Sequence, residues 1–138
     1  MKIVLDTNVV IDLLANRLPF ADDAEAVFDV IGQGGVSAAI TANTVTDIAY
    51  IMRKYLSRGN LKTALLGIME LCDVLEVNHE NCIGAFDLSM PDYEDALLAH
   101  CTKKWQADYI VTRNLKDFRE SPVPALVPGD FLRLIESE

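Results

Sequence analysis

Acidic residues occur at four separated points of the chain, and their types and positions suit a chemical role. They are Asp6, Asp47, the pair Asp92 and Asp95, and Asp117. Carboxylates that are gathered at one end of a folded domain repel one another and resist ionisation unless a cation lies among them. If the fold brings these residues together, we therefore expect a site for a divalent metal ion.

The first of these acids, Asp6, ends the apolar run from Ile3 to Leu5 and is followed by Thr7 and Asn8. Thr7 or Asn8 is expected to cap a helix that begins here. Asp6 itself would lie at the tip of a buried strand, where partial removal from water is costly for a carboxylate without a counter-charge. Its position therefore favours a functional role over capping alone.

The second acid, Asp47, has a strong structural alternative. Thr44 and Asp47 have the spacing of a capping box, in which Thr44 caps a helix and Asp47 is its acidic partner. The local pattern favours this interpretation and a functional one equally. Only the expected position beside Asp6 favours function.

The remaining acids also occur where helices are expected to begin. Asp92 and Asp95 lie one turn apart, where the helix macrodipole favours acids, and both carboxylates could point into one site. Asp117 follows Thr112 and Asn114, and Asn114 is a candidate cap. In the functional interpretation Asp117 is a fourth carboxylate, and Thr112 or Asn114 contacts a water or a phosphate.

Apolar strands alternate with amphipathic helices along the chain. Strands are expected at residues 3–5, 36–40, 74–77, 109–112 and 125–127. Helices are expected from the apolar spacing at 24–31, 45–52, 65–72 and 97–105, with Asn60 as an N-cap, a short helix at 82–86 and a last helix from Asp130. This alternation predicts an α/β fold, a three-layer α/β/α sandwich with a mostly parallel five-stranded sheet.

The strand ends should position the acids. Ligands of such sheets bind beyond the carboxyl ends of the strands. Asp6, Asp47 and Asp117 each follow an expected strand, so they are predicted to share one edge. Asp92 and Asp95 precede a strand, and residues 80–91 would have to carry the chain back to that edge.

The bulk properties of the 138 residues indicate a single domain over residues 1–138. The chain start lacks the pattern of a signal peptide and no apolar run is long enough to span a membrane, which favours a cytoplasmic protein. Cys72, Cys82 and Cys101 are expected to be reduced core residues. The net charge of -9 argues against a protein that coats nucleic acid passively, but not against a nuclease whose carboxylates hold metal.

Four segments taken together resemble a PIN domain. They are residues 5–9, 44–47, 95–99 and 108–118, and the last is the most specific because Thr112-Arg113-Asn114 is followed by Asp117-Phe118. The match is ordered and spans nearly the whole chain, and it is most similar to the VapC-type toxins of toxin-antitoxin pairs. The resemblance implies a metal-dependent endoribonuclease that uses Mg²⁺ or Mn²⁺, with sheet order 3-2-1-4-5. It also implies a homodimer and a small antitoxin whose tail enters the acidic groove.

Carried over by position, the resemblance makes Asp6, Asp47, Asp95 and Asp117 the catalytic acids. Asp6, Asp95 and Asp117 are the metal-binding residues, with Asp6 and Asp95 as direct ligands, while Asp47 and Asp117 hold metal-bound waters. The supporting residues are Thr7, Asn8, Asp92, Thr112 and Asn114. The family usually has Glu where this chain has Asp47, so this shorter side chain is expected to reach the metal through water.

An RNA substrate needs positive charge near the acids. Arg113 and Lys116 are the candidate substrate-binding residues, and Arg119, Arg53, Lys54 and Arg58 are further cations. Each of them taken singly is typical of an ordinary surface charge. A dimer could pool them into one groove.

Other functions are compatible with parts of the pattern. A PIN-like module that is catalytically weak or inactive, and acts by binding RNA or protein, is suggested by Asp47 in place of Glu. A phosphoacceptor module of the receiver type needs an Asp at the end of the third strand, but Asn78 and His79 follow it. A haloacid-dehalogenase-like phosphatase needs an Asp where the chain has Asn8. The local chemistry excludes the last two.

Overall fold

A five-stranded sheet in which all neighbouring strands are parallel forms the centre of the protein. The structure is a computed structural model that describes all residues, 1–138. The strands are β1 (Lys2–Leu5), β2 (Ser37–Thr41), β3 (Cys72–Leu75), β4 (Tyr109–Val111) and β5 (Ala125–Leu126). Their order is β3-β2-β1-β4-β5, which confirms the expected order 3-2-1-4-5.

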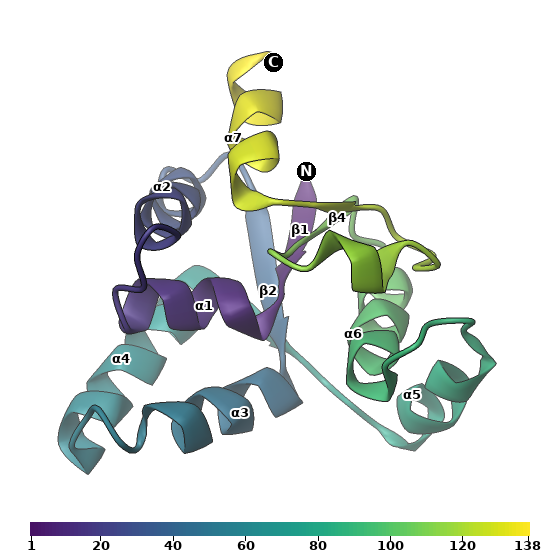
Figure 1. The fold of residues 1–138 in the computed structure, drawn as a ribbon, viewed down its shortest axis with the longest axis horizontal. Coiled ribbons are helices and arrows are strands. Elements are labelled where there is room, and N and C mark those ends of the chain that lie inside the picture. Colours follow the sequence, from purple (N-terminus) through teal and green to yellow (C-terminus); the bar gives the residue numbers. More distant parts are fainter.

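Helices cover both faces of the sheet (Figure 1), so the expected three-layer α/β/α architecture is confirmed. They are α1 (Thr7–Leu14), α2 (Ala21–Gly32), α3 (Ala42–Met52), α4 (Arg58–Leu71), α5 (His79–Gly84), α6 (Tyr93–Lys104) and α7 (Pro128–Glu136), with 3-10 turns η1 (Ala85–Asp87) and η2 (Leu115–Phe118). The helices α1 to α4 lie on one side in the view of Figure 1, and α5 and α6 lie on the other.

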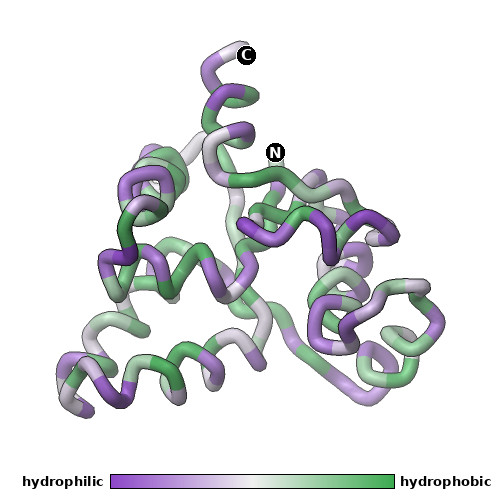
Figure 2. Tube along the Cα trace, in the orientation of Figure 1, coloured by the Kyte–Doolittle hydropathy of each residue, from purple (hydrophilic) through white to green (hydrophobic).

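Strand β1 shows why this sequence folds in three layers. Ile3 and Leu5 are fully buried in a core cluster that also contains residues of α1 and α2, whereas Val4 is buried in a second cluster with Leu98 and Ala99 of α6. Successive side chains of a strand point to opposite faces, so a continuous apolar run suits a strand that is covered twice. In Figure 2 this strand is mostly hydrophobic, whereas hydrophobic and hydrophilic residues alternate along the helices.

The register of the central strands brings two polar residues together at one edge. Leu5 of β1 pairs with Val111 of β4, and the Asp6 N–H donates a 3.0 Å hydrogen bond to the Val111 carbonyl. Asp6 and Thr112 therefore come directly after paired strand ends. The pairing of β1 with β4 thus places both residues at the carboxyl ends of the strands, where the site was predicted.

Several helices begin at residues other than those expected. Ser57 caps α4, with its hydroxyl accepting from the Asn60 N–H, so Asn60 is not the cap. Helix α7 begins at Pro128 rather than at Asp130, because proline fits the first position of a helix. Helix α3 begins at Ala42, three residues earlier than the apolar spacing indicates.

The short helix α5 is held against α6 by a close contact between Gly84 and His100. A Cβ built on Gly84 would lie 2.2 Å from the Nε2 atom of His100, and the Nδ1 atom of His100 is 3.2 Å from the Nδ2 atom of Asn81. His100 therefore has a packing role, as its apolar surroundings in the sequence indicate. This contact fixes the segment that leads back to the start of α6.

We expect the substitution Gly84→Ala to destabilise the protein by about 1–3 kcal/mol, because the added methyl group must displace the His100 ring and break its contact with Asn81. Urea unfolding of the variant measures this loss. Gly67→Ala in α4 is the matched control, because no atom lies within 4 Å of a Cβ placed there. Equal stability of the two variants would contradict the packing role of Gly84.

The three cysteines form no disulfide, as expected. Cys72 and Cys101 are buried, and burial raises the pKa of the Cys72 thiol to about 12. Cys82 is half-buried. None of the helices combines the length and the hydrophobicity that a bilayer crossing requires.

Candidate active site

Asp6 is the best-anchored acid of the site. It is the N-cap of α1, so it holds the position in which Thr7 or Asn8 was expected. Its Oδ1 atom accepts from the Thr7 N–H at 2.8 Å, and its Oδ2 atom accepts from the Thr112 hydroxyl at 2.8 Å and from the Asn8 amide at 3.3 Å. These contacts fix the orientation of the carboxylate.

Burial raises the pKa of Asp6, although hydrogen bonds from Thr112 and Thr7 and the positive charge of Arg113 lower it. The charge of Asp92 adds to the increase. The hydrogen bonds that the protein donates to this carboxylate therefore do not fully compensate for the water that the carboxylate loses on burial. A bound cation would supply the missing stabilisation.

Asp47 lies in the second turn of α3, which begins at Ala42 after the N-cap Thr41. Thr44 is therefore inside the helix rather than at its cap, and its hydroxyl contacts those of Thr7 and Thr41 at 3.0 and 3.2 Å. The capping-box interpretation of Thr44 and Asp47 is wrong. Because Asp47 has no capping function, the structural alternative to a role in the site is removed.

Asp92 and Asp95 have different roles at the start of α6. Asp92 is the N-cap of α6, and its Oδ1 atom accepts from the Asp95 N–H at 3.0 Å. Asp95 is the third residue of that helix. Burial, followed by the charges of Asp6, Asp92 and Asp117, raises the pKa of Asp95 to about 7. Its carboxylate is thus close to the other acids and has no cation beside it.

Glu94 is an acid that the sequence analysis did not single out for the site. Hydrogen bonding to Asp47, with burial and the charges of Asp47, Asp92 and Asp95, raises its pKa to about 7. The raised pKa shows that Glu94 lies close to Asp47 and to the other acids. Only the adjacency of Glu94 to Asp95 in the sequence could have indicated it, and that pattern is also typical of an ordinary helix start.

Asp117 lies on η2 beside the site. Its Oδ2 atom accepts a hydrogen bond from the Nδ2 atom of Asn114, and its charge contributes to the raised pKa of Asp95. The Thr112 hydroxyl accepts from the Asn114 N–H at 3.0 Å. The residues Thr112, Asn114 and Asp117 therefore form a connected polar group that leads from Asp6 to Asp95.

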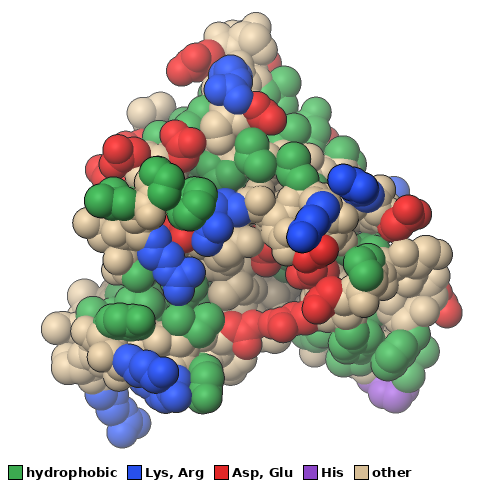
Figure 3. Space-filling view, viewed as in Figure 1, with side chains coloured by type: hydrophobic (Ala, Val, Ile, Leu, Met, Phe, Trp, Pro, Cys, Tyr) green, Lys and Arg blue, Asp and Glu red, His purple; other side chains and the backbone are tan.

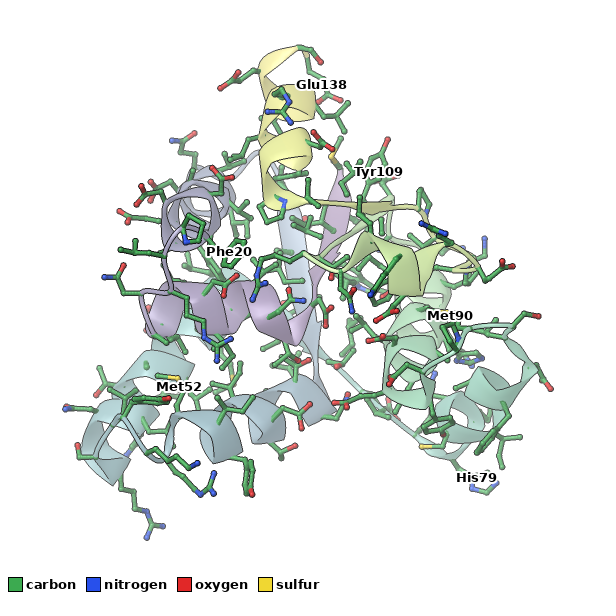
Figure 4. All side chains as sticks on the ribbon, viewed as in Figure 1. Phe20, Met52, His79, Met90, Tyr109 and Glu138 are labelled. Atoms are coloured by element: carbon green, nitrogen blue, oxygen red, sulfur yellow. The ribbon has the colours of Figure 1, made fainter.

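The two candidate substrate-binding cations lie elsewhere. Arg113 is paired with Asp12 of α1, Nε to Oδ2 at 2.5 Å and Nη2 to Oδ1 at 3.2 Å, and its guanidinium lies 3.9 Å from the centre of the Phe20 ring. Asp12 is 1% exposed, so this arginine compensates a buried charge and is not free on the surface. Lys116 is exposed on η2 and lies outside the lining of the acidic cavity. Figure 4 shows Phe20 beside α1, where α2 begins.

Four acids and several neutral polar groups line one open cavity of about 440 Å³. The acids are Asp6, Asp47, Glu94 and Asp95, and the polar residues include Thr7, Asn8, Thr44 and Asn114. Arg17, which is exposed, is the one cation in the lining. Red side chains gather at the corresponding place near the centre of Figure 3. The fold thus brings acids from α3, α6 and the end of β1 to one cavity, whereas Asp92 and Asp117 lie outside its lining.

The donor set suits a hard cation. Carboxylate, amide and hydroxyl oxygens are the ligands that Mg²⁺ prefers, and Mg²⁺ usually keeps several waters and takes only one or two carboxylates. No group of three or more acidic, histidine or cysteine side chains lies close enough together to hold a metal ion on its own. The residues therefore fit a water-rich magnesium site, and they do not fit a cage made only of protein ligands.

We expect the metal-free protein to lose stability as the pH rises from about 4 to about 7. The folded pKa of Asp95 is about 7 and its ordinary value is 3.8, so the folded state holds this proton more tightly than the unfolded state does. Ionisation of Asp95 therefore costs stability across this window. Urea unfolding in a chelator at pH 5 and pH 8 should show a smaller loss for Asp95→Asn than for the wild type. Parallel losses in both proteins would rule out this role of Asp95.

Comparison with known proteins identifies the family. The model of the PIN domain family matches residues 2–116. VapBC2 from Rickettsia felis, bound to a DNA fragment from their promoter, shares the fold with a TM-score of 0.72 at 15% identity over 92% of this chain and 98% of that chain. DNA-bound VapBC from Salmonella typhimurium gives 0.71 at 19% identity, covering 93% and 98%. A toxin-antitoxin complex from Klebsiella pneumoniae gives 0.69 at 18% identity, covering 91% and 96%.

A search of the curated proteins gives no match. The identities of the structural neighbours are low, so their likeness concerns the fold. The family model rests on the sequence itself, covers most of the chain and includes Asp6, Asp47 and Asp95. The chain therefore belongs to the PIN domain family.

Proposed function

We propose that this protein is a metal-dependent endoribonuclease that hydrolyses RNA phosphodiester bonds with Mg²⁺ or Mn²⁺. The observation that carries the proposal is the cavity in which Asp6, Asp47, Glu94 and Asp95 meet, with the pKa of Asp95 raised to about 7. Acids held this close without a cation destabilise the fold. A site that is unfavourable until a divalent ion binds is typical of a metal-dependent active site.

In this proposal Asp6 and Asp95 would hold the metal directly, and Asp47 and Asp117 would hold its waters and orient the attacking water. Bound there, Mg²⁺ or Mn²⁺ would activate a water and neutralise charge on the scissile phosphate. Thr112 and Asn8 keep the Asp6 carboxylate oriented through the 2.8 and 3.3 Å hydrogen bonds.

Glu94 adds a role that the shorter Asp47 makes necessary. Because Glu94 and Asp47 share a hydrogen bond, the proposal assigns to the pair the position at which the family usually has one Glu. In its ionised form the Glu94 carboxylate would accept a proton from a water on the cavity side.

We further propose that the chain acts as the toxin of a toxin-antitoxin pair, as a homodimer in the cytoplasm, and that a small antitoxin protein silences it. Support comes from the structural neighbours, which include VapBC complexes and a toxin-antitoxin complex. The acidic cavity offers a place for a basic segment of such a partner.

The second candidate is a PIN module with weak or no catalysis that acts by binding RNA or protein. It is favoured by Asp47, which lacks one methylene relative to the usual Glu. Cleavage assays separate the two candidates. Purified protein is incubated with structured and single-stranded RNA in Mg²⁺, in Mn²⁺ and in EDTA. The ribonuclease proposal expects fragments with either metal and none in EDTA, and metal-independent or absent cleavage would contradict it.

A further inference from the structure

The end of α3 and the start of α4 carry a charge opposite to that of the rest of the protein. The chain has 21 acidic and 12 basic residues, yet residues 48–69 contain no Asp or Glu and four of the cations. Those cations are Arg53, Lys54, Arg58 and Lys62, all exposed and none in an ion pair. Figure 3 shows blue side chains over α3 and α4 at the lower left, beside the red group of the cavity.

Helix stability does not explain these cations. Arg58 is the first residue of α4 and Lys62 the fifth, so both lie at the positive end of the helix macrodipole, where acids are favoured. They are also four residues apart, a spacing at which like charges repel. Both effects oppose folding and would be relieved by a negatively charged ligand.

Two exposed tyrosines are interleaved with the cations. Tyr50 is 66% and Tyr55 68% exposed. The Arg53 guanidinium lies 3.7 Å from the centre of the Tyr50 ring, and its Nη1 atom donates to the Tyr50 carbonyl. The arginine thus holds the Tyr50 ring from one side, and both side chains remain at the surface. Exposed aromatic rings beside arginines are typical of surfaces that bind single-stranded nucleic acid.

Tyr50 joins this surface to the acidic cavity. It lines the cavity together with Asp47, which lies one turn earlier on the same helix. A strand that crosses the cavity therefore meets Tyr50, and Arg53 lies against the Tyr50 ring. We call the residues Tyr50, Arg53, Lys54, Tyr55, Arg58 and Lys62 the α3–α4 surface.

We propose that the α3–α4 surface binds the single-stranded RNA that flanks the scissile bond, with a base stacked on Tyr50 and backbone phosphates on Arg53 and Arg58. The inference rests on the proposed ribonuclease function and adds the surface that holds the unpaired RNA beside the cavity. A duplex keeps its bases stacked internally and cannot offer one to Tyr50. An acidic protein would use the cations but would gain little from two exposed tyrosines.

Binding of a short fluorescein-labelled oligouridylate, measured by fluorescence anisotropy in Mg²⁺, tests the proposal. All proteins carry Asp6→Asn, so that the probe remains intact. Tyr50→Ala should weaken binding about tenfold, whereas Tyr50→Phe should stay within about twofold because it keeps the ring. Arg53→Glu should weaken binding about tenfold and reduce the slope of log Kd against log salt by about 0.7. Lys103→Glu, an exposed charge reversal on α6, is the matched control and should change Kd by less than about twofold.

Three results would overturn the proposal. The first is an unchanged Kd for the oligouridylate in Tyr50→Ala. The second is an equal loss of affinity in Lys103→Glu and Arg53→Glu. The third is binding of duplex RNA or polyglutamate as tightly as the oligouridylate. The assay contains no cleavage step. If the oligouridylate binds as expected but the wild type cleaves no RNA, only the ribonuclease function fails. If the wild type cleaves RNA but the Tyr50 and Arg53 variants bind normally, only the α3–α4 surface fails.

Discussion

Asp95→Asn is expected to reduce RNA cleavage by a factor of about 100 to 10,000. Asp95 is a proposed direct ligand of the metal, and its ionised form is opposed by burial and by the charges of Asp6, Asp92 and Asp117. Its side chain makes no hydrogen bond within the protein, whereas its backbone N–H donates to Asp92. The substitution therefore removes the charge and keeps the local structure.

Initial rates of cleavage at saturating Mg²⁺ measure this loss. Asp29→Asn, an exposed acid on α2 outside the cavity, is the matched control and should cleave at the wild-type rate. Thermal unfolding should show that Asp95→Asn is folded, and at neutral pH in chelator it should be at least as stable as the wild type. Cleavage by Asp95→Asn within about twofold of the wild type would contradict the proposed role. Asp6→Asn should lose activity to a similar extent.

Arg113→Ala is expected to destabilise the protein by about 3–5 kcal/mol. The substitution leaves the carboxylate of Asp12, which is 1% exposed, without the guanidinium that contacts both of its oxygens. It also removes a positive charge that stabilises ionised Asp6, because the charge of Arg113 lowers the pKa of Asp6. Urea unfolding of the variant measures the change in the free energy of unfolding.

A double-mutant cycle separates the ion pair from simple loss of packing. Asp12→Leu with Arg113→Leu should cost less than the sum of the two single substitutions, since no buried charge is then left alone. Arg119→Ala, an exposed arginine of the same segment, is the matched control and should stay within about 0.5 kcal/mol of the wild type. A cost below about 1 kcal/mol for Arg113→Ala, or strict additivity in the cycle, would show that the pair does not stabilise the fold.

The architecture could be predicted from the sequence because the apolar pattern is strong. A continuous apolar run such as Ile3 to Leu5 permits few structures other than a strand covered on both faces, and this was confirmed. Helix starts were less predictable. Asn60 and Ser57 are both good caps, and the choice of Ser57 depends on where α4 packs. The same uncertainty gave the incorrect capping box at Thr44 and Asp47.

The positions of Asp6, Asp47 and Asp117 follow from topology, since parallel strands end at one edge. Asp95 needed the family resemblance, because α5 and its contact with His100 set the path to α6. Side-chain partners far apart in the sequence could not be predicted. Arg113 meets Asp12 across 101 positions, and the one local signal was a charged residue within the apolar helix α1.

The most direct test of the metal site is binding of Mn²⁺ itself, measured by electron paramagnetic resonance without any RNA. Free Mn²⁺ gives a strong signal that falls when the ion is bound. The wild type should bind Mn²⁺ more tightly as the pH rises through about 7, since Asp95 must lose its proton to bind a cation. Asp95→Asn should bind at least about tenfold more weakly, and Asp29→Asn should bind as the wild type does. Equal Mn²⁺ binding by the wild type and Asp95→Asn would contradict a metal site among these acids.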